Sequence, residues 1–293
     1  MDPDLCLAVD IGGTKLAAGV VSATGELMDR VTEPTGDPAD AEALHAKVEA
    51  LVGRFAPFER YVACGVGCGG PMSPDGELVS PLNIEVWRDF PLAERLRSQT
   101  GLRVWLDNDA KALALAEGWV GAATGHQNFM AMVVSTGVGG GIVLDGRLLE
   151  GRMGNAGHVG HVVVSTPGRS LPGHVDGVLE AEASGTAIAA HTGGPAAEAS
   201  HDERVTCGTL VGRAVGSTAN LLDLPLVVVA GSVALGYGAT FFDAAQSEID
   251  RVCQLDFSRG TTIVPAGLGD SGPLIGAAAV ALRHLGLPGG PTL

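Results

Sequence analysis

The sequence has 293 residues, of which 46% are hydrophobic and 17% charged, and its formal net charge is −15 at pH 7. This composition supports a large buried core, while the acidic charge and the 4% of aromatic residues argue against a nucleic-acid binder. The five scattered cysteines and the lack of a long apolar run favour a reduced, cytoplasmic protein without a signal peptide or a membrane span.

The pattern of apolar runs and turns in the first 120 residues predicts an α/β domain. LCLAVD is a buried strand, GGT a turn and KLAAGVVS a second strand; a dinucleotide-binding start would have a helix after the turn. Apolar residues at helical spacing predict a helix over residues 37–55. A later strand ends in the polar run DND at residues 107–109, where a helix begins, and small-molecule sites collect at such places.

The second part of the chain begins in the same way, with a buried strand, the glycine turn TGVGGG and another strand. Helices are predicted over residues 180–191, 207–222 and 237–252, with strands at LPLVVVAG and TTIVPAG. We therefore expect two related α/β domains, residues 1–120 and 121–271. A last helix, within residues 272–293, is expected to pack on the first domain.

The motifs DIGGTK, GGP, DNDA, STGVGGG and GHVGH, in this order, resemble those of the ROK (repressor, ORF, kinase) family. The resemblance implies an actin-like ATPase (ribonuclease H-like) fold, with mixed sheets and flanking helices in two domains that close on ATP and a sugar. Repressors of the family carry an N-terminal winged helix, whereas the first strand here is expected to start near Leu5. The resemblance therefore favours a sugar kinase.

The resemblance makes DIGGTK the first phosphate loop. Gly12 and Gly13 can bring backbone N–H groups close to phosphate oxygens, and Thr14 and Lys15 can add a hydroxyl and a positive charge. By resemblance, Asp10 helps to hold Mg²⁺ through water. The six residues alone fit a simple hairpin turn equally well.

The second phosphate loop implied by the resemblance contains Thr136, Gly137 and Gly139. Gly231 and Ser232 follow a predicted strand, and the family has a glycine-rich turn beside the adenosine at this point. Ser232 departs from that pattern, in which glycine is more usual. A flexible turn and a plain strand end are the structural alternatives.

Asp109 is the predicted catalytic base, because transfer of phosphate to a sugar hydroxyl needs a carboxylate that can accept the hydroxyl proton. Asn108 would orient the sugar through its amide, and Gly70 and Asn83 match sugar contacts of the family. Asp107 stands where other members often have Glu. The alternatives are a helix cap for Asp109 and loop roles for Gly70 and Asn83.

The family pattern E-x-G-H appears here as His158–Val159–Gly160–His161. His161 keeps the position of the family histidine, and His158 replaces the glutamate that binds sugar hydroxyls. Glu180 matches the last position of the next family motif and is also expected to reach a sugar hydroxyl. An acidic residue at a helix N-terminus is its structural alternative.

The family histidine also binds a structural zinc together with three downstream cysteines. Leu171, Gly173 and Val178 stand where these cysteines would be. Because zinc needs about four ligands, the sequence predicts that the family zinc is absent and that packing orders the loop.

The sequence thus predicts an ATP-dependent hexose kinase that uses Mg²⁺ and acts on glucose O6, without nucleic-acid or membrane partners. The replacement of Glu by His158 leaves an N-acetylhexosamine (GlcNAc or ManNAc) kinase open. A sugar-sensing regulatory protein with weak or lost catalysis is a third reading. Polyphosphate as the phosphate donor also stays open, and a homodimer or homotetramer is expected.

Overall fold

The computed structural model describes residues 4–293, which form two compact units. Unit 1 contains the chain up to Thr124 together with Leu148–Ala156 and Leu268–Leu293. Unit 2 contains Gly125–Arg147 and Gly157–Gly267. No sequence pattern indicates that Leu148–Ala156 groups with unit 1.

Unit 1 is built on a five-stranded sheet with the strand order β3-β2-β1-β4-β5. Its strands are β1 (Leu5–Ile11), β2 (Lys15–Ser22), β3 (Leu27–Pro34), β4 (Tyr61–Cys68) and β5 (Val104–Asn108). β1 runs antiparallel to β2 and parallel to β4, which in turn runs parallel to β5. The carboxyl ends of β1, β4 and β5 therefore meet at one edge of the sheet.

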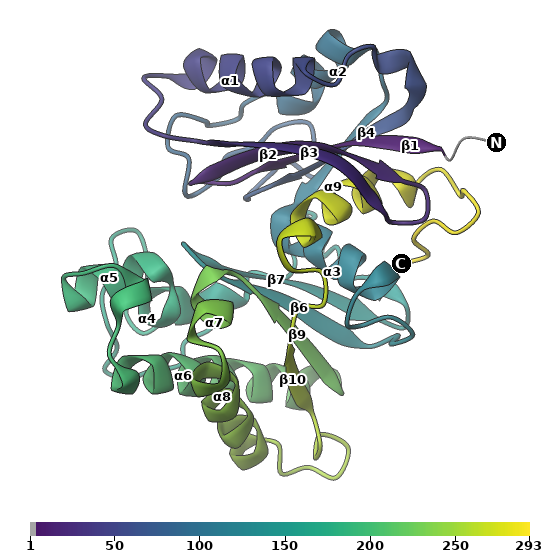
Figure 1. The fold of residues 1–293 in the computed structure, drawn as a ribbon. Coiled ribbons are helices and arrows are strands. Elements are labelled where there is room, and N and C mark those ends of the chain that lie inside the picture. The colour runs from purple at the N-terminus through teal and green to yellow at the C-terminus, as the bar shows by residue number, and fades with distance from the viewer. Residues whose placement is uncertain (1–3) are drawn as a thin grey trace. The chain divides into compact units, whose positions relative to one another are not determined.

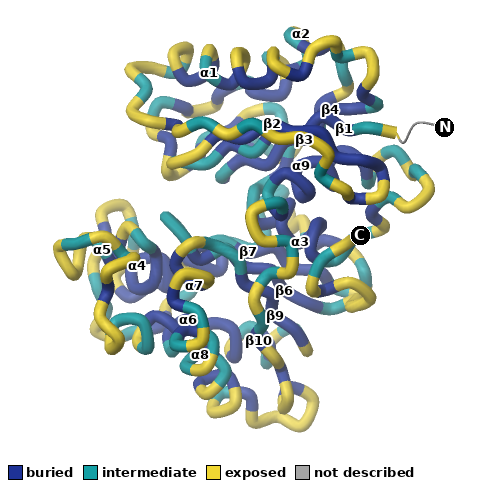
Figure 2. The backbone as a smooth tube through the Cα atoms, in the orientation of Figure 1, coloured by how far each residue is buried: buried dark blue, intermediate teal, exposed yellow. Residues whose placement is uncertain are grey.

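Helices cover both faces of this sheet, α1 and α2 on one side and α3 and α9 on the other (Figure 1). They are α1 (Ala41–Gly53), α2 (Leu92–Thr100), α3 (Asp109–Val120) and α9 (Gly272–Leu282). Alternate residues of β1 supply the two cores: Leu7 and Val9 join one cluster, and Cys6 and Ala8 join the other. This alternation is the two-residue period of a strand that is buried on both faces, and Figure 2 shows β1 and β4 as buried.

Gly65 of β4 allows α9 to approach the sheet closely. A Cβ atom at Gly65 would lie 1.9 Å from the carbonyl oxygen of Ala277. Gly65→Ala is therefore expected to destabilise the protein by about 1–3 kcal/mol, since the backbone of α9 must move. Urea unfolding measures this change. Gly53→Ala is the control, because its Cβ would meet only the side-chain nitrogen of Gln99 at 4.0 Å; equal loss in both variants would contradict the packing argument.

Unit 2 has a sheet with the strand order β10-β9-β6-β7-β8. Its strands are β6 (Phe129–Val134), β7 (Val138–Leu144), β8 (Arg147–Leu148), β9 (Leu226–Ala230) and β10 (Thr262–Pro265). β6 runs antiparallel to β7 and parallel to β9, and β9 runs parallel to β10. Both sheets are thus mixed and flanked by helices, which confirms the predicted α/β class.

The helices of unit 2 are α4 (Leu179–Ala183), α5 (Gly185–Thr192), α6 (His201–Leu222), α7 (Ser232–Tyr237) and α8 (Ala239–Val252). Short 3₁₀ helices are η1 (Phe58–Arg60), η2 (Val159–His161), η3 (Ala196–Glu198) and η4 (Gly269–Ser271). The single helix predicted over residues 180–191 is two helices, because Ser184 has an extended backbone and its hydroxyl caps α5 by accepting from the Ala187 N–H. Within residues 4–293, no helix is both long and apolar enough to cross a membrane.

Candidate active site

Asp10 and Asp109 belong to the edge of unit 1 where the parallel strands end. In the pairing of β1, β4 and β5, Ile11 lies beside Cys68, and Cys68 lies beside Asn108. Burial, followed by the nearby charge of Asp109, raises the pKa of Asp10 to about 7. Burial and the same two carboxylates raise the pKa of the Cys68 thiol. The edge therefore concentrates negative charge in a partly desolvated place.

Asn108 and Asp109 form the junction between β5 and α3. The side-chain oxygen of Asn108 accepts from the Ala110 N–H at 3.0 Å, and the Asp109 carboxylate accepts from the same group at 2.8 Å. The N-terminal end of a helix also favours a negative charge. The start of α3 thus fixes Asp109 in place.

The raised pKa of Asp10 makes a stability prediction for the ligand-free protein. In the unfolded chain an aspartate ionises near pH 3.9, whereas Asp10 in the folded protein ionises at about 7. Between these two pH values Asp10 is protonated in the folded state and ionised in the unfolded chain. The contribution of the protonated carboxyl to the free energy of unfolding is therefore present at low pH and is lost as the pH rises to 7. Asp10→Asn is expected to remove this loss, so the variant gains stability relative to wild type from pH 4 to 8.

Urea unfolding of both proteins across this range, without nucleotide, measures the difference. A stability difference between wild type and Asp10→Asn that stays constant from pH 4 to 8 would contradict the assignment of the raised pKa to Asp10.

The predicted first phosphate loop is the turn between β1 and β2. The Gly12 N–H donates to the Lys15 carbonyl oxygen at 2.9 Å and closes the turn. Thr35 holds the loop from outside, since its hydroxyl donates to the Gly12 oxygen at 2.7 Å and its N–H donates to the Thr14 oxygen at 3.1 Å. A Cβ atom at Gly13 would lie 3.0 Å from the Cβ and the carbonyl oxygen of Asn83. The structure therefore brings Asn83 next to this loop.

Gly70 lies in the loop after β4, and hydrogen bonds from other segments fix this loop. The Gly70 oxygen accepts from the Leu82 N–H at 3.1 Å, which links Gly70 to the segment that carries Asn83. The side chain of Asn155 accepts from the Met72 N–H at 3.2 Å and donates to the Met72 oxygen at 3.0 Å. Sequence reasoning missed Asn155, although the Gly-Asn turn that contains it precedes His158.

In unit 2, the predicted second phosphate loop connects β6 and β7. Ser135 at its start donates its N–H to the Gly137 oxygen at 2.9 Å, and the Thr136 oxygen accepts from the Thr186 hydroxyl at 2.9 Å. The hydroxyls of Ser135 and Ser232 are 3.0 Å apart. The structure thus brings the loop into contact with the turn at Ser232.

Two glycines of this region keep close backbone contacts. A Cβ atom at Gly231, where φ is +104°, would lie 2.3 Å from the Val134 oxygen. Gly139 pairs with Val133 in the antiparallel ladder of β6 and β7. Gly139 therefore lies on β7 and Gly231 directly follows β9, and these are the two strands that flank β6.

Glu180 and three histidines gather on one side of unit 2. One carboxylate oxygen of Glu180 accepts from the Val138 N–H at 2.6 Å, and the other lies 2.8 Å from Nε2 of His174. The rings of His161 and His174 have centroids 5.3 Å apart, and those of His158 and His161 are 5.9 Å apart. Burial, and then the charge of His161, lower the pKa of His158. Sequence reasoning did not assign His174 to the sugar site.

The zinc of the family does not fit the donor atoms of this loop. Leu171 and Val178 are buried among Ala181 and Ala187, so these two positions present hydrocarbon where the resemblance expects thiolates. Nε2 of His174 faces Glu180. Across residues 4–293, no three or more His, Cys, Asp or Glu side chains are arranged to hold a metal ion.

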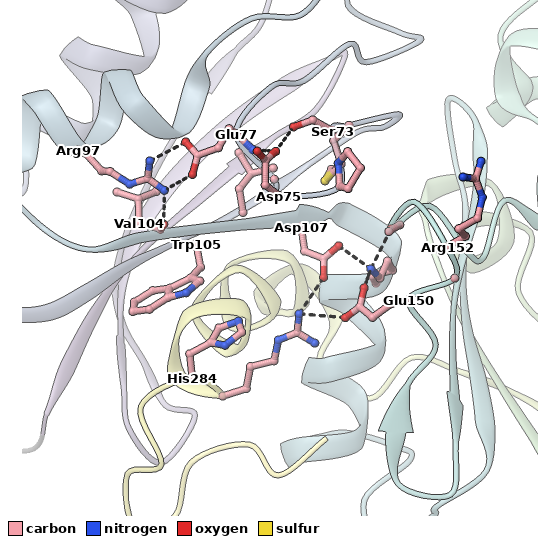
Figure 3. A pocket seen from close by; sticks show the side chains of 18 residues that line it. Ser73, Asp75, Glu77, Arg97, Val104, Trp105, Asp107, Glu150, Arg152 and His284 are labelled. Atoms are coloured by element: carbon pink, nitrogen blue, oxygen red, sulfur yellow. Dashed lines mark hydrogen bonds and ion pairs between the residues drawn. The ribbon is translucent and has the colours of Figure 1, made fainter.

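A pocket of about 420 Å³ in unit 1 is lined by a network of charged side chains (Figure 3). Asp107 accepts from Lys111 at 3.0 Å and from Arg283 at 3.2 Å. Lys111 also contacts the Glu150 carboxylate and donates to the Gly154 oxygen at 3.1 Å. None of the predicted site residues lines this pocket, although Asp107, the residue before Asn108, does.

The chain is similar to known proteins of one family. A family model described as "ROK family" matches residues 6–284. A glucokinase of Thermotoga maritima is 37% identical over 184 residues, which cover 62% of this chain and 58% of that protein. An N-acetylmannosamine kinase of Yersinia pseudotuberculosis is 35% identical over 252 residues, which cover 79% of this chain and 84% of that protein.

The fold of this chain is also similar to that of a solved structure. The ROK family glucokinase of Streptomyces griseus, in complex with glucose and AMPPNP, has a TM-score of 0.82 and 29% sequence identity. The match covers 94% of this chain and 98% of that one. The relatives thus include kinases named for two different sugars.

Proposed function

Because the chain belongs to the ROK family, we propose that it is an ATP-dependent hexose kinase. The reaction transfers the γ-phosphate of ATP to a sugar hydroxyl, and we propose O6 of glucose as the acceptor. One observation carries the proposal: Asp10, near the end of β1, and Asp109, directly after β5, lie at the edge of one sheet where the parallel strands end. Neighbouring carboxylates of this kind suit a bound cation and a proton acceptor.

Asp109 is the proposed general base. It would accept the proton of the sugar hydroxyl while the oxygen attacks the γ-phosphate in line. Asn108, held by its cap on α3, would orient the same hydroxyl. Asp10 would hold Mg²⁺ through water, and the cation neutralises charge on the phosphate oxygens.

The glycine loops are proposed to hold ATP. The Gly12 N–H closes the turn onto the Lys15 oxygen, so Gly12 would shape the loop. The Gly13 N–H, with Thr14 and the exposed Lys15, would bind phosphate oxygens. Thr136, Gly137 and Gly139 would do the same from the second loop, and Gly231 and Ser232 would lie by the adenosine. The contact between Ser135 and Ser232 supports a shared role for these two segments.

The remaining predicted residues are proposed to bind the sugar: Gly70, Asn83, His158, His161 and Glu180. Since burial lowers the pKa of His158, this side chain is a neutral imidazole at pH 7. It then offers one donor and one acceptor to a hydroxyl, whereas the family glutamate offers a charged acceptor. This difference supports an N-acetylhexosamine kinase as the second candidate.

ADP release by the purified protein tests the function, with glucose, mannose, N-acetylglucosamine and N-acetylmannosamine, each with MgATP or polyphosphate. The highest kcat/KM with glucose and MgATP is expected. A higher value with an N-acetylated sugar would select the second candidate. Sugar binding by calorimetry without turnover on any acceptor would overturn the kinase proposal in favour of a sugar sensor.

A homodimer or homotetramer is the proposed assembly. Light scattering gives the mass of the purified protein, and a value of 29.6 kDa, that of one chain, would overturn this proposal.

A further inference from the structure

The loop of residues 165–180 ends at Glu180, which is held from two directions. From one side, the Val138 N–H at the start of β7 donates to a carboxylate oxygen at 2.6 Å. From the other side, Nε2 of His174 lies 2.8 Å from the second oxygen. With a hydrogen on Nε2, the imidazole donates to the carboxylate and fixes its orientation.

His174 is itself well fixed within the loop. Its backbone N–H donates to the Leu171 oxygen at 3.0 Å, and Nδ1 of the ring lies 3.2 Å from the Pro172 oxygen. Both ring nitrogens thus face oxygen acceptors, and both donate only when the imidazole carries two hydrogens. The side chains of His174 and Glu180 are only 13% and 10% exposed, so water competes little for their contact. The tilted ring of His161 lies next to His174, which connects the contact to the proposed sugar-binding histidines.

Backbone hydrogen bonds and packing order the rest of the loop. The Gly177 oxygen accepts from the Val164 N–H at 2.8 Å, and the Leu179 N–H donates to the Val162 oxygen at 2.8 Å. Leu171 and Val178 are buried in a small apolar cluster. The loop therefore has a defined path, and the contact between His174 and Glu180 joins its tip to its end.

We propose that His174 is a positioning residue that holds Glu180 toward the sugar hydroxyls, in place of the structural metal that the resemblance assigns to this loop. The ligand of Glu180 is a neutral hexose, whose hydroxyls donate to a carboxylate that His174 and Val138 keep in place. This inference rests on the proposed function, since it takes Glu180 as a sugar contact.

Steady-state kinetics of His174→Ala and His174→Gln test the proposal. Loss of one hydrogen bond to a charged group is expected to raise KM for the sugar about tenfold in His174→Ala. The value of kcat and KM for ATP should stay within about twofold, because the Val138 N–H, which adjoins the proposed second phosphate loop, still holds the other carboxylate oxygen of Glu180 in the variant. The glutamine amide can replace Nε2 as donor, so His174→Gln should recover most of the affinity.

Two controls separate positioning from a general effect on the fold. His126→Ala removes an exposed histidine of the same unit and should change neither KM for the sugar nor KM for ATP. In a Glu180→Gln background, His174→Ala should add less than in wild type, because the two residues act through one contact. Independent effects of the two substitutions, or equal sugar KM in wild type and His174→Ala, would overturn the proposal.

Hydrogen exchange and metal analysis of the full chain give readouts that do not need turnover. His174→Ala should speed amide exchange over residues 171–180 without sugar or ATP, and a chelator should leave exchange of the wild type unchanged. One equivalent of zinc in the wild type that His174→Ala loses would overturn the inference. If the wild type turns over no sugar, only the kinase proposal is contradicted. The amide exchange rates then test the role of His174 separately, and unchanged rates in His174→Ala would overturn that role.

Discussion

Asp109→Asn is expected to lower kcat for sugar phosphorylation by about 10²–10⁴-fold, the usual contribution of a general base. Asparagine has nearly the same shape, and its oxygen can still accept from the Ala110 N–H that now lies 2.8 Å from the carboxylate. The variant should therefore keep α3 intact and keep its affinity for the sugar. The lost property is the capacity to accept the hydroxyl proton.

Removal of the Asp109 charge also has a measurable effect on its neighbour. Because Asp109 helps to raise the pKa of Asp10, that pKa should fall in Asp109→Asn, and the loss of stability with rising pH should become smaller. This second effect can be followed in the absence of substrate.

ADP release at saturating sugar and MgATP measures the change in kcat, and calorimetry measures sugar binding. Asp145→Asn is the matched control, since Asp145 is exposed in a tight turn with φ of +51°, a conformation that asparagine also adopts. A residual kcat above one tenth of wild type in Asp109→Asn, with the control unchanged, would contradict the role of Asp109 as base.

The strand-end positions of Asp10 and Asp109 could be predicted because they depend on local patterns. A buried apolar run before each residue gives a strand, and the turn or helix after it gives the place where the strand ends. The same patterns predicted both glycine turns. Two pairs of parallel strands then bring the ends of β1, β4 and β5 together, which the order of motifs suggested only through a family resemblance.

The contacts of Glu180 could not be predicted in this way. His174 lies in a loop without periodicity, and its ring reaches Glu180 only because Gly177 and Val178 are tied to the preceding strand-like segment. The break at Ser184 also escaped the helical pattern, since alanine-rich sequence on both sides favours a continuous helix. Side-chain caps and contacts across a loop are decided by tertiary structure.

The contacts of Lys111, which lies in a helix, also could not be predicted from the local sequence. Its neighbours KALALAEG indicate a helical segment in which a lysine is expected on the exposed face. In the structure its side chain is 2% exposed, because Asp107, Glu150 and the Gly154 oxygen surround its ammonium group. The last two come from a segment about 40 residues later in the chain, and nothing in the local sequence indicates that this segment returns to unit 1.

Lys111→Met is expected to destabilise the protein by about 3–5 kcal/mol, since it breaks a buried ion pair and leaves Arg283 as the remaining positive charge on the Asp107 carboxylate. Asp107, whose side chain is 6% exposed, would keep the contact with Arg283 at 3.2 Å and the hydrogen bond from the Asn108 N–H at 2.8 Å. The segment that contains Glu150 and Gly154 would lose its attachment to α3. Urea unfolding measures the free energy, and Arg259→Met is the control, because its pair with Asp256 is exposed and should contribute little.

The destabilisation by Lys111→Met should also depend on pH. Burial already raises the pKa of Asp107, and Lys111 is the largest influence that lowers it. Without Lys111 that pKa rises further, so the folded state gains from protonation of Asp107 as the pH falls, and the loss of stability should be smaller at pH 5 than at pH 8. The double variant Asp107→Asn/Lys111→Met should recover part of the loss at pH 8 and show a weaker pH dependence. An equal loss at both pH values, with no recovery in the double variant, would show that Lys111 stabilises unit 1 by packing of its hydrocarbon chain and not by its charge.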